Sequence, residues 1–393
     1  MREQSEVNTI NTFTTILLTI LIFEVMILTH ELGHYITARI FDTHILEFSV
    51  GMGPRLLKKK SKKTGIIYSL RLLPIGGFVQ MVGENGDTSL TEEEKARYRD
   101  QTGEEIPEND PRALSKKPIW QRMIIIAAGG VTNILIGIIL TFAMVLSMPA
   151  LGSTVVAEFA ENATSNAGET ALMKDDIILK INSTRVSTHM MLAYQIMHDG
   201  DRPVDITVVR GAELIYNDEG EYVSYAGGEK LVLEGVTFPG AFAEGIDASF
   251  GDMDFSVYRI EKSAGVCFSQ SAEYSRMMVK TVWDSLFDLI RGRYGIEALS
   301  GPVGVSSEIG TAAKGGPSSL LYIIVLLSVN LGIINLLPVP ALDGGHLLFL
   351  LIELIRRKPI DPELKGKING IALMLLFALA IFIMFKDIVG LFR

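Results

Sequence analysis

The sequence HELGH at residues 30–34 stands inside the first apolar run of the chain, which covers residues 10–40. On a helix, His30 and His34 lie one turn apart, so both imidazoles project from the same face. This spacing suits Zn²⁺, which binds histidine nitrogens and, in catalytic sites, keeps one position for water. Glu31 lies between them, where it can accept a proton from that water. Two histidines and a glutamate are costly in hydrocarbon, which favours a metal site over a chance occurrence of the motif.

The composition indicates a membrane protein. Of the 393 residues, 48% are hydrophobic, and the mean hydropathy of +0.32 is too high for a soluble enzyme of this size. Four apolar segments are long enough to cross a bilayer. The first lacks the basic start and the small-residue cleavage site of a signal peptide, so we interpret it as a retained span. The sequence therefore predicts a polytopic α-helical protein with transmembrane helices in residues 12–40, 118–150, 318–358 and 359–393.

The charge distribution predicts how the chain is oriented in the membrane. The net charge of −9 disfavours a nucleic-acid-binding function. Basic residues cluster at 58–63, 116–122 and 356–358, next to the ends of the spans, whereas residues 175–221 are strongly acidic. The positive-inside rule then places the loop with the first two clusters and the loop with the third cluster in the cytosol, and both termini outside it. The single cysteine, Cys267, excludes an intrachain disulfide and a cysteine-based zinc site.

Residues 41–117 are expected to form a cytosolic loop that contains a β-hairpin. Residues 66–72 partly alternate, and the turn signal PIGG at 74–77 precedes a second apolar run. A hairpin this apolar can enter the bilayer only where protein covers its backbone, and an exposed edge could pair with an extended substrate. Residues 85–117 are polar and poor in aliphatic side chains, which predicts a loosely folded segment.

The region between the second and third spans is expected to be a separate extracytoplasmic α+β domain. Residues 151–262 contain four predicted strands, and residues 172–186 resemble the core of a PDZ domain, with Ala171 and Asp175 where such domains usually carry glycine. Such a domain could bind a peptide or exclude bulky substrates, and we favour the second role. Residues 263–317 are expected to form a loop and an amphipathic helix on the outer leaflet.

The second span carries the small residues AAGG at 127–130 and an intramembrane amide, Asn133. Small residues let transmembrane helices approach closely, and an amide in the membrane usually bonds to a neighbouring helix. We therefore interpret both features as helix packing. Glu24 shares a face with Glu31, two turns away, and either lines a watery cavity or lies near the outer interface. We favour the interface.

A second motif, NLLPVPALDGGH at residues 335–346, interrupts the third apolar segment. Its two prolines and two adjacent glycines break the helix and make room for a polar site. Asp343 is then a carboxylate at membrane depth without a nearby cation in the sequence, which is costly unless a positive charge meets it. A Zn²⁺ ion held by His30, His34 and Asp343 supplies that charge and completes three protein ligands. For His346, a role as a neighbour of the site or a structural residue and a role as a ligand are equally compatible with the sequence, so we leave it out of the ligand set.

These motifs closely resemble, in the same order, the site-2 protease family of intramembrane zinc metalloproteases, in particular the bacterial branch that cleaves anti-sigma factors. The resemblance rests on HELGH and on PIGGFVQM at 74–81, SGPVG at 300–304 and the motif around Asp343, and it covers nearly the whole chain. It implies zinc held by His30, His34 and Asp343, with Glu31 as general base. It also implies that Asn335 lies near the active site and that a membrane-reentrant strand contacts the substrate through Gly77, Phe78, Val79, Gln80 and Met81.

The expected activity is therefore hydrolysis of a peptide bond in the transmembrane segment of a single-span substrate, such as an anti-sigma factor or a signal-peptide remnant. The expected location is the bacterial cytoplasmic membrane, with the lipid bilayer around the spans and the active site near the cytosolic side. The competing interpretation is a polytopic transporter or metal-binding protein without hydrolytic activity, which predicts internal repeats and acidic residues in both halves. The sequence shows no such repeat. An inactive scaffold would not need Glu31.

Overall fold

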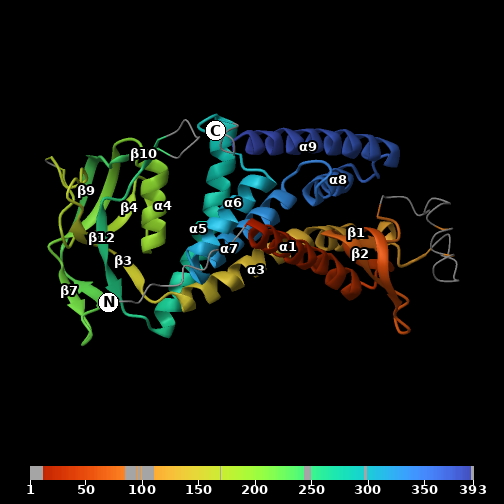
Figure 1. The fold of residues 1–393 in the computed structure, drawn as a ribbon, viewed down its shortest axis with the longest axis horizontal. Coiled ribbons are helices and arrows are strands. Elements are labelled where there is room, and N and C mark those ends of the chain that lie inside the picture. Colours follow the sequence, from red (N-terminus) through yellow and green to blue (C-terminus); the bar gives the residue numbers. More distant parts are fainter. Residues whose placement is uncertain are drawn as a thin grey trace. The chain divides into compact units, whose positions relative to one another are not determined.

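The computed structural model describes residues 12–84, 95, 99, 110–168, 170–242, 249–295 and 299–390. The chain forms two compact units, shown in Figure 1. We call residues 1–137 with 300–393 the helical unit, and residues 138–299 the sheet unit. Most of the segment predicted to be loosely folded, 85–117, lies outside the described residues, apart from a 3₁₀ turn at Leu114–Lys116.

Four helices in the described part of the chain are long and apolar enough to cross a membrane. They are α1 (Thr12–Ile40), α3 (Ile119–Ser147), α7 (Pro317–Leu336) and α9 (Pro362–Gly390). This confirms the prediction of a polytopic membrane protein.

The third predicted span is interrupted as the prolines in the motif suggested. Helix α7 ends at Leu336, and α8 (Asp343–Arg356) begins after six residues that are not helical. A further helix, α6 (Pro302–Lys314), lies where the sequence analysis expected a loop. The reason is local, because Pro302 occupies the first turn, where its fixed φ favours helix initiation and its missing N–H costs nothing.

Small residues bring α1, α3 and α7 close together in the helical unit. A Cβ atom added to Gly33 would collide with the Ala128 backbone, and one added to Gly130 would lie 2.8 Å from the carbonyl oxygen of Gly332. Asn133 is fully buried, and its side-chain oxygen accepts a hydrogen bond from Thr29 of α1 at 3.1 Å. The packing role predicted for Ala128, Gly130 and Asn133 is therefore confirmed.

Strands β1 (Ile45–Lys60) and β2 (Ile67–Met81) form an antiparallel hairpin that is folded back on itself. It is not the hairpin predicted within residues 66–82, because β2 runs through the predicted turn at 74–77 and its two halves pair with β1 and not with each other. Residues 47–50 pair with 77–80 on one side and with 67–70 on the other, and residues 55–60 pair with 67–71. Two glycines with positive φ, Gly51 and Gly76, permit the bends. Within the described residues, the segment 77–81 is thus an outer edge of this small sheet.

A buried charge cluster holds the folded hairpin together. Glu47 is only 2% exposed, and its carboxylate accepts hydrogen bonds from Arg71 at 2.8 Å and from the Ser69 hydroxyl at 2.5 Å, and it also pairs with Arg55. Burial alone would raise the pKa of Glu47, but these donors and the two guanidinium charges lower it below its ordinary value. One carboxylate therefore joins three segments of the sheet.

The sheet unit is built around an eight-stranded sheet with the order β7-β8-β12-β3-β4-β6-β9, to which β5 is added beside β4 (Figure 1). A second, two-stranded sheet pairs β10 with β11. All four strands that the sequence predicted are present, as β3, β4, β6 and β9. The strands span Leu151–Phe159 (β3), Ile177–Ile181 (β4), Thr184–Arg185 (β5), Val204–Arg210 (β6), Glu213–Tyr216 (β7), Tyr222–Ala226 (β8), Glu229–Val236 (β9), Gly240–Phe242 (β10), Ser249–Gly251 (β11) and Phe255–Ile260 (β12).

Helix α5 (Ala264–Arg291) is the predicted amphipathic helix, and it also packs within the sheet unit. It contacts α4 (His189–Asp199) through Tyr194, whose hydroxyl donates to Asp284 at 2.8 Å, and through His198, which lies 2.9 Å from Asp288. In its apolar stripe, Met278 is fully buried whereas Trp283 is 41% exposed. Only part of the stripe is therefore available to a lipid surface.

Candidate metal centre

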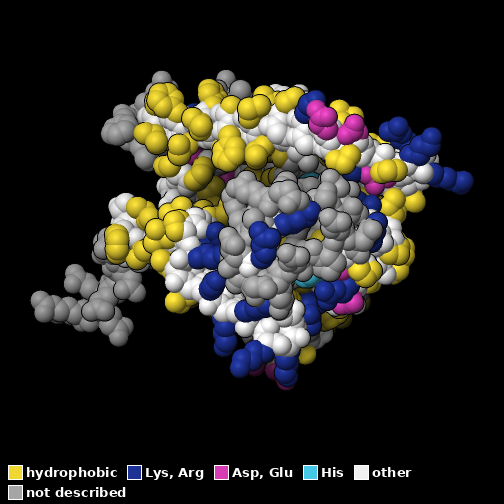
Figure 2. Space-filling model, turned by 90° about the vertical axis from the view of Figure 1, so that its right-hand side faces the viewer, with side chains coloured by type: hydrophobic (Ala, Val, Ile, Leu, Met, Phe, Trp, Pro, Cys, Tyr) yellow, Lys and Arg dark blue, Asp and Glu magenta, His cyan; other side chains and the backbone are white. Residues whose placement is uncertain are grey.

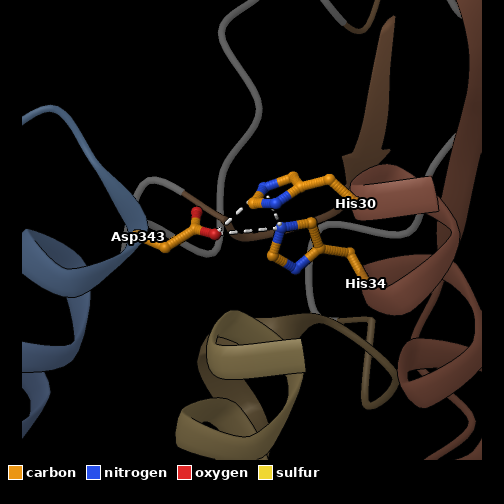
Figure 3. Close-up of side chains that lie close together, drawn as sticks. All are labelled: His30, His34 and Asp343. Carbon is orange, nitrogen blue, oxygen red and sulfur yellow. Dashed lines mark hydrogen bonds and ion pairs between the residues drawn. The ribbon is translucent and has the colours of Figure 1, made fainter. Parts of the chain in front are cut away.

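Three side chains of the helical unit point toward one another in Figure 3. The Nε2 atoms of His30 and His34 are 3.2 Å apart, and each lies 3.2 Å from Oδ2 of Asp343. Among the described residues, this is the group of histidine, cysteine and acidic side chains whose geometry could hold a metal ion. The structure thus brings together the three residues that the two sequence motifs singled out.

The local structure explains why these atoms converge. His30 and His34 are one turn apart on α1, and Asp343 is the first residue of α8, directly after the break in the third apolar segment. Nδ1 of His34 lies 2.8 Å from the carbonyl oxygen of Ile125 in α3. A carbonyl only accepts, so a neutral His34 carries its proton on Nδ1 and turns the lone pair of Nε2 toward Asp343.

The arrangement fits a zinc ion. With its proton on Nδ1, His34 presents an acceptor to the Asp343 carboxylate, and two acceptors 3.2 Å apart need a cation between them. Oδ2 of Asp343 is buried and has no hydrogen-bond partner in the described part of the chain. Ligands about 2.0–2.1 Å from a tetrahedral zinc are about 3.3–3.4 Å apart, close to the observed separation. Three protein ligands leave the fourth position for water or substrate.

Gly129 of α3 leaves the space that the centre occupies. A Cβ atom at this position would lie 2.7 Å from Nε2 of His30 and closer still to Nε2 of His34. Any side chain here would therefore collide with the two nitrogens at the point where they face Asp343. The sequence predicts only helix packing for this glycine, since nothing in the run AAGG separates packing from a site contact.

Glu31 lies beside the outer edge of the folded hairpin. Its carboxylate lies near the backbone of Val79, and a Cβ atom added to Gly77 would lie 3.6 Å from Cγ of Glu31. The backbone N–H of Met81, two residues further along the strand, points to the Glu84 carboxylate at 3.4 Å. Backbone groups two residues apart face the same side of a strand. Gly77, Val79 and Met81 thus direct backbone groups away from β1, toward the centre.

The remaining predicted substrate-contacting residues are placed differently. The side chains of Phe78 and Gln80 are half-buried, whereas those of Val79 and Met81 are buried in the core. Asn335 lies in the last turn of α7, immediately before the break that leads to Asp343. No hydrogen bond from its side chain is present within the described residues.

Glu24 has a role that neither sequence interpretation gave it. Its carboxylate lies against the backbone of Gly51 and Gly76, the two bends of the hairpin. It therefore contributes to the contact between the hairpin and α1. The partners are backbone groups, which is why no partner was visible in the sequence.

His346 and Glu84 belong to a small cavity next to the centre. The cavity has a volume of about 100 Å³, and its polar lining consists of Glu84, Arg122, His346, Lys365 and Asn369. His346 is not part of the three-residue group, in agreement with its exclusion from the ligand set. Glu84 lies within electrostatic range of Glu31, His34 and Asp343, and the sequence analysis did not single it out.

Comparison with known proteins gives a consistent family assignment. The family model described as Peptidase family M50 matches residues 18–379. A Clostridium acetobutylicum protein named a zinc metalloprotease is 31% identical over 384 residues, which are 96% of this chain and 98% of that protein. The regulator of sigma-W protease RasP of Bacillus subtilis is 27% identical over 454 residues, 96% of this chain and 99% of that protein. The zinc metalloprotease RasP of Bacillus licheniformis is 28% identical over 444 residues, with the same coverage.

Proposed function

The chain belongs to peptidase family M50 and is an intramembrane zinc metalloprotease of the site-2 protease type, and on this premise we propose that the three-residue centre is its active site. In this proposal His30, His34 and Asp343 hold Zn²⁺, and Glu31 is the general base. The observation that carries the assignment is that the three ligand atoms lie 3.2 Å from one another, and that Gly129 leaves the space between them open.

The reaction follows from the position of Glu31. When bound, zinc polarises the scissile carbonyl and makes its water more acidic. Glu31 neighbours both ligand histidines and faces the edge strand, so it is placed to accept the proton of the attacking water. The same carboxyl group then delivers this proton to the leaving amine. Burial of the centre keeps bulk water away from these steps.

We propose that an unwound substrate segment pairs with the edge strand at Gly77, Phe78, Val79, Gln80 and Met81. A helical substrate hides its carbonyl groups in its own hydrogen bonds, so it must unwind locally before water can attack. In hydrocarbon the freed backbone groups need new partners, and an open strand edge offers them. The outward backbone groups of Val79 and Met81 support this role. Asn335 is proposed to donate a hydrogen bond to the substrate backbone or to the oxyanion.

The proposed substrates are single-span membrane proteins. One relative is named as the regulator of sigma-W protease, which supports anti-sigma factors as the substrate class. Signal-peptide remnants have the same chemistry, an apolar helix with one cleavable end, and are included in the proposal.

The metal assignment is tested by zinc analysis of the purified protein. We expect one zinc per chain in the parent protein and loss of zinc and of proteolysis in His30→Ala. His346→Ala is the matched control, because it removes a nearby histidine that lies outside the ligand group, and it should retain the metal. Full zinc content in His30→Ala would reject the proposed centre.

The edge-strand assignment is tested by photo-crosslinking. Benzoylphenylalanine in place of Gln80 should crosslink to a substrate held by the inactive Glu31→Gln variant. The same probe in place of Leu57, which is 66% exposed on the opposite outer segment, should not. Equal crosslinking at both positions would remove the basis for strand pairing.

The proposed orientation puts both termini outside the cytosol and the centre near the cytosolic side of the bacterial inner membrane. Figure 2 shows Lys and Arg side chains gathered on the face that includes β1 and β2, as the positive-inside rule requires of a cytosolic loop. Between its charged ends this hairpin exposes Met52, Leu70 and Leu72, which supports its proposed re-entry into the membrane.

Orientation is measured with membrane-impermeant thiol reagents. Cys267 is the native free cysteine and is first replaced by serine. Cysteines at Lys60 and Arg357 should then react only from the cytosolic side, and one at Asp218 only from outside. Labelling of position 60 from outside would invert the topology.

The sheet unit is proposed to be an extracytoplasmic PDZ-type domain that limits the size of substrates. Asp175 supports the PDZ assignment, because it adopts φ +68°, the left-handed conformation for which such domains use glycine. Its carboxylate accepts a hydrogen bond from Tyr258 at 2.7 Å, which helps to hold this conformation.

A variant lacking residues 153–262 distinguishes a size filter from a peptide-binding domain. Only a size filter predicts that this variant cleaves a substrate with a folded ectodomain.

A further inference from the structure

Helix α9 is mostly exposed, and none of its described residues is buried as a whole. A polar side chain of this helix that reaches the break between α7 and α8 is therefore notable. Asn369 is such a residue, because its Oδ1 accepts a hydrogen bond from the backbone N–H of Ala341 at 3.1 Å. Ala341 lies two residues before the proposed zinc ligand Asp343.

Four residues of the break between α7 and α8 carry a backbone N–H group. Three of these groups donate to carbonyl oxygens of the break itself or of the last turn of α7. Leu337 donates to Ile334 at 3.1 Å, Val339 to Leu337 at 2.6 Å, and Leu342 to Val339 at 3.2 Å. Pro338 and Pro340 have no N–H. The N–H of Ala341 is the one group of residues 337–342 whose acceptor lies on another helix. In hydrocarbon an unpaired N–H is costly, so the break depends on Asn369.

Ala341 also adopts a conformation that an L-residue rarely takes. Its φ is +72°, in the left-handed region, where its Cβ crowds the backbone. The inner side of the break has no freedom to adjust, because a Cβ on Gly345 would lie 2.5 Å from the Val339 carbonyl oxygen. The break is thus closely packed on the inside and held on the outside by one hydrogen bond.

We propose that Asn369 is a positioning residue, which fixes Ala341 in its left-handed conformation and thereby places the Asp343 carboxylate against the two histidines. This inference rests on the proposed zinc centre. Without the amide oxygen, the Ala341 N–H loses its acceptor and the backbone can relax toward ordinary φ values. Asp343, two residues later, is then no longer preorganised for the metal.

The experiment measures the zinc dissociation constant of the full-length protein in detergent by competition with a chelator. Residues that orient metal ligands typically change affinity by about 10–100-fold when removed, so Asn369→Ala should weaken zinc binding about tenfold. The decisive comparison is made in an Ala341→Gly background. Glycine adopts φ +72° without strain, so Asn369→Ala should there cost about threefold or less.

Two controls make the outcomes distinct. Asp387→Ala removes another polar attachment of α9, to the backbone N–H groups of Gly301 and Gly304, and should leave the zinc affinity unchanged. An equal loss in Asp387→Ala, or the same tenfold loss in both backgrounds at position 341, would overturn the inference. His30→Ala serves as reference. If it keeps its zinc, the proposed centre itself is wrong, whereas an unaffected Asn369→Ala beside a zinc-free His30→Ala rejects only the positioning role.

Discussion

Replacing Glu31 by glutamine should leave zinc bound and lower kcat for peptide-bond hydrolysis by about 10³-fold or more. The amide has nearly the same shape as the carboxylate, but it cannot accept the proton of the attacking water. The three proposed ligand atoms are untouched, because they belong to His30, His34 and Asp343. Loss of turnover with full zinc content is therefore the expected result, measured by cleavage of a reporter substrate and by metal analysis of the same preparation.

Glu24→Gln provides a matched control on the same helix. Glu24 is also an intramembrane carboxylate of α1, but it lies against the hairpin backbone at Gly51 and Gly76. Glutamine has nearly the same shape and can keep this contact, so activity should fall less than about tenfold. Comparable losses in both variants would show that charge on this helix face matters in general, and the assignment of Glu31 as the base would be lost.

The sequence predicted the parts of the protein that depend on local patterns. Helical spacing put His30 and His34 on one face, and long apolar runs marked the four helices that could cross a membrane. The motif around Asp343 signalled both a broken helix and a carboxylate in need of a cation. These inferences succeed because hydrocarbon penalises an unpaired charge or backbone group so strongly that few explanations remain.

The parts that could not be predicted depend on contacts between distant segments. Nothing in β1 or β2 alone indicates that residues 47–50 pair on both sides, because that register is set by the buried cluster around Glu47. The neighbours of Glu24 and Ala341 are likewise far away in the sequence, and each contact has a backbone group at one end. Backbone groups are the same in every residue, so such partners leave no trace in the sequence.

Gly129→Ala should weaken zinc binding by at least about 100-fold and abolish activity, although it is the smallest possible side-chain addition. The new Cβ would lie 2.7 Å from Nε2 of His30 and even closer to Nε2 of His34, so it would occupy the space where both nitrogens meet the metal. The histidines cannot move away easily, since Gly33 packs against the Ala128 backbone and fixes the distance between α1 and α3. Zinc content and activity should therefore fall together.

Gly137→Ala, two turns further along α3, separates this effect from helix packing. There the added Cβ would lie 2.6 Å from a methyl group of Val329, which belongs to a side chain that can shift. Overpacking of this kind costs about 1–3 kcal/mol of stability, without a direct effect on the centre. We expect Gly137→Ala to unfold at a lower temperature yet keep one zinc per chain, whereas Gly129→Ala loses the metal while still folded. If Gly129→Ala retained zinc at parental affinity, α3 could not pass as close to the centre as the structure places it.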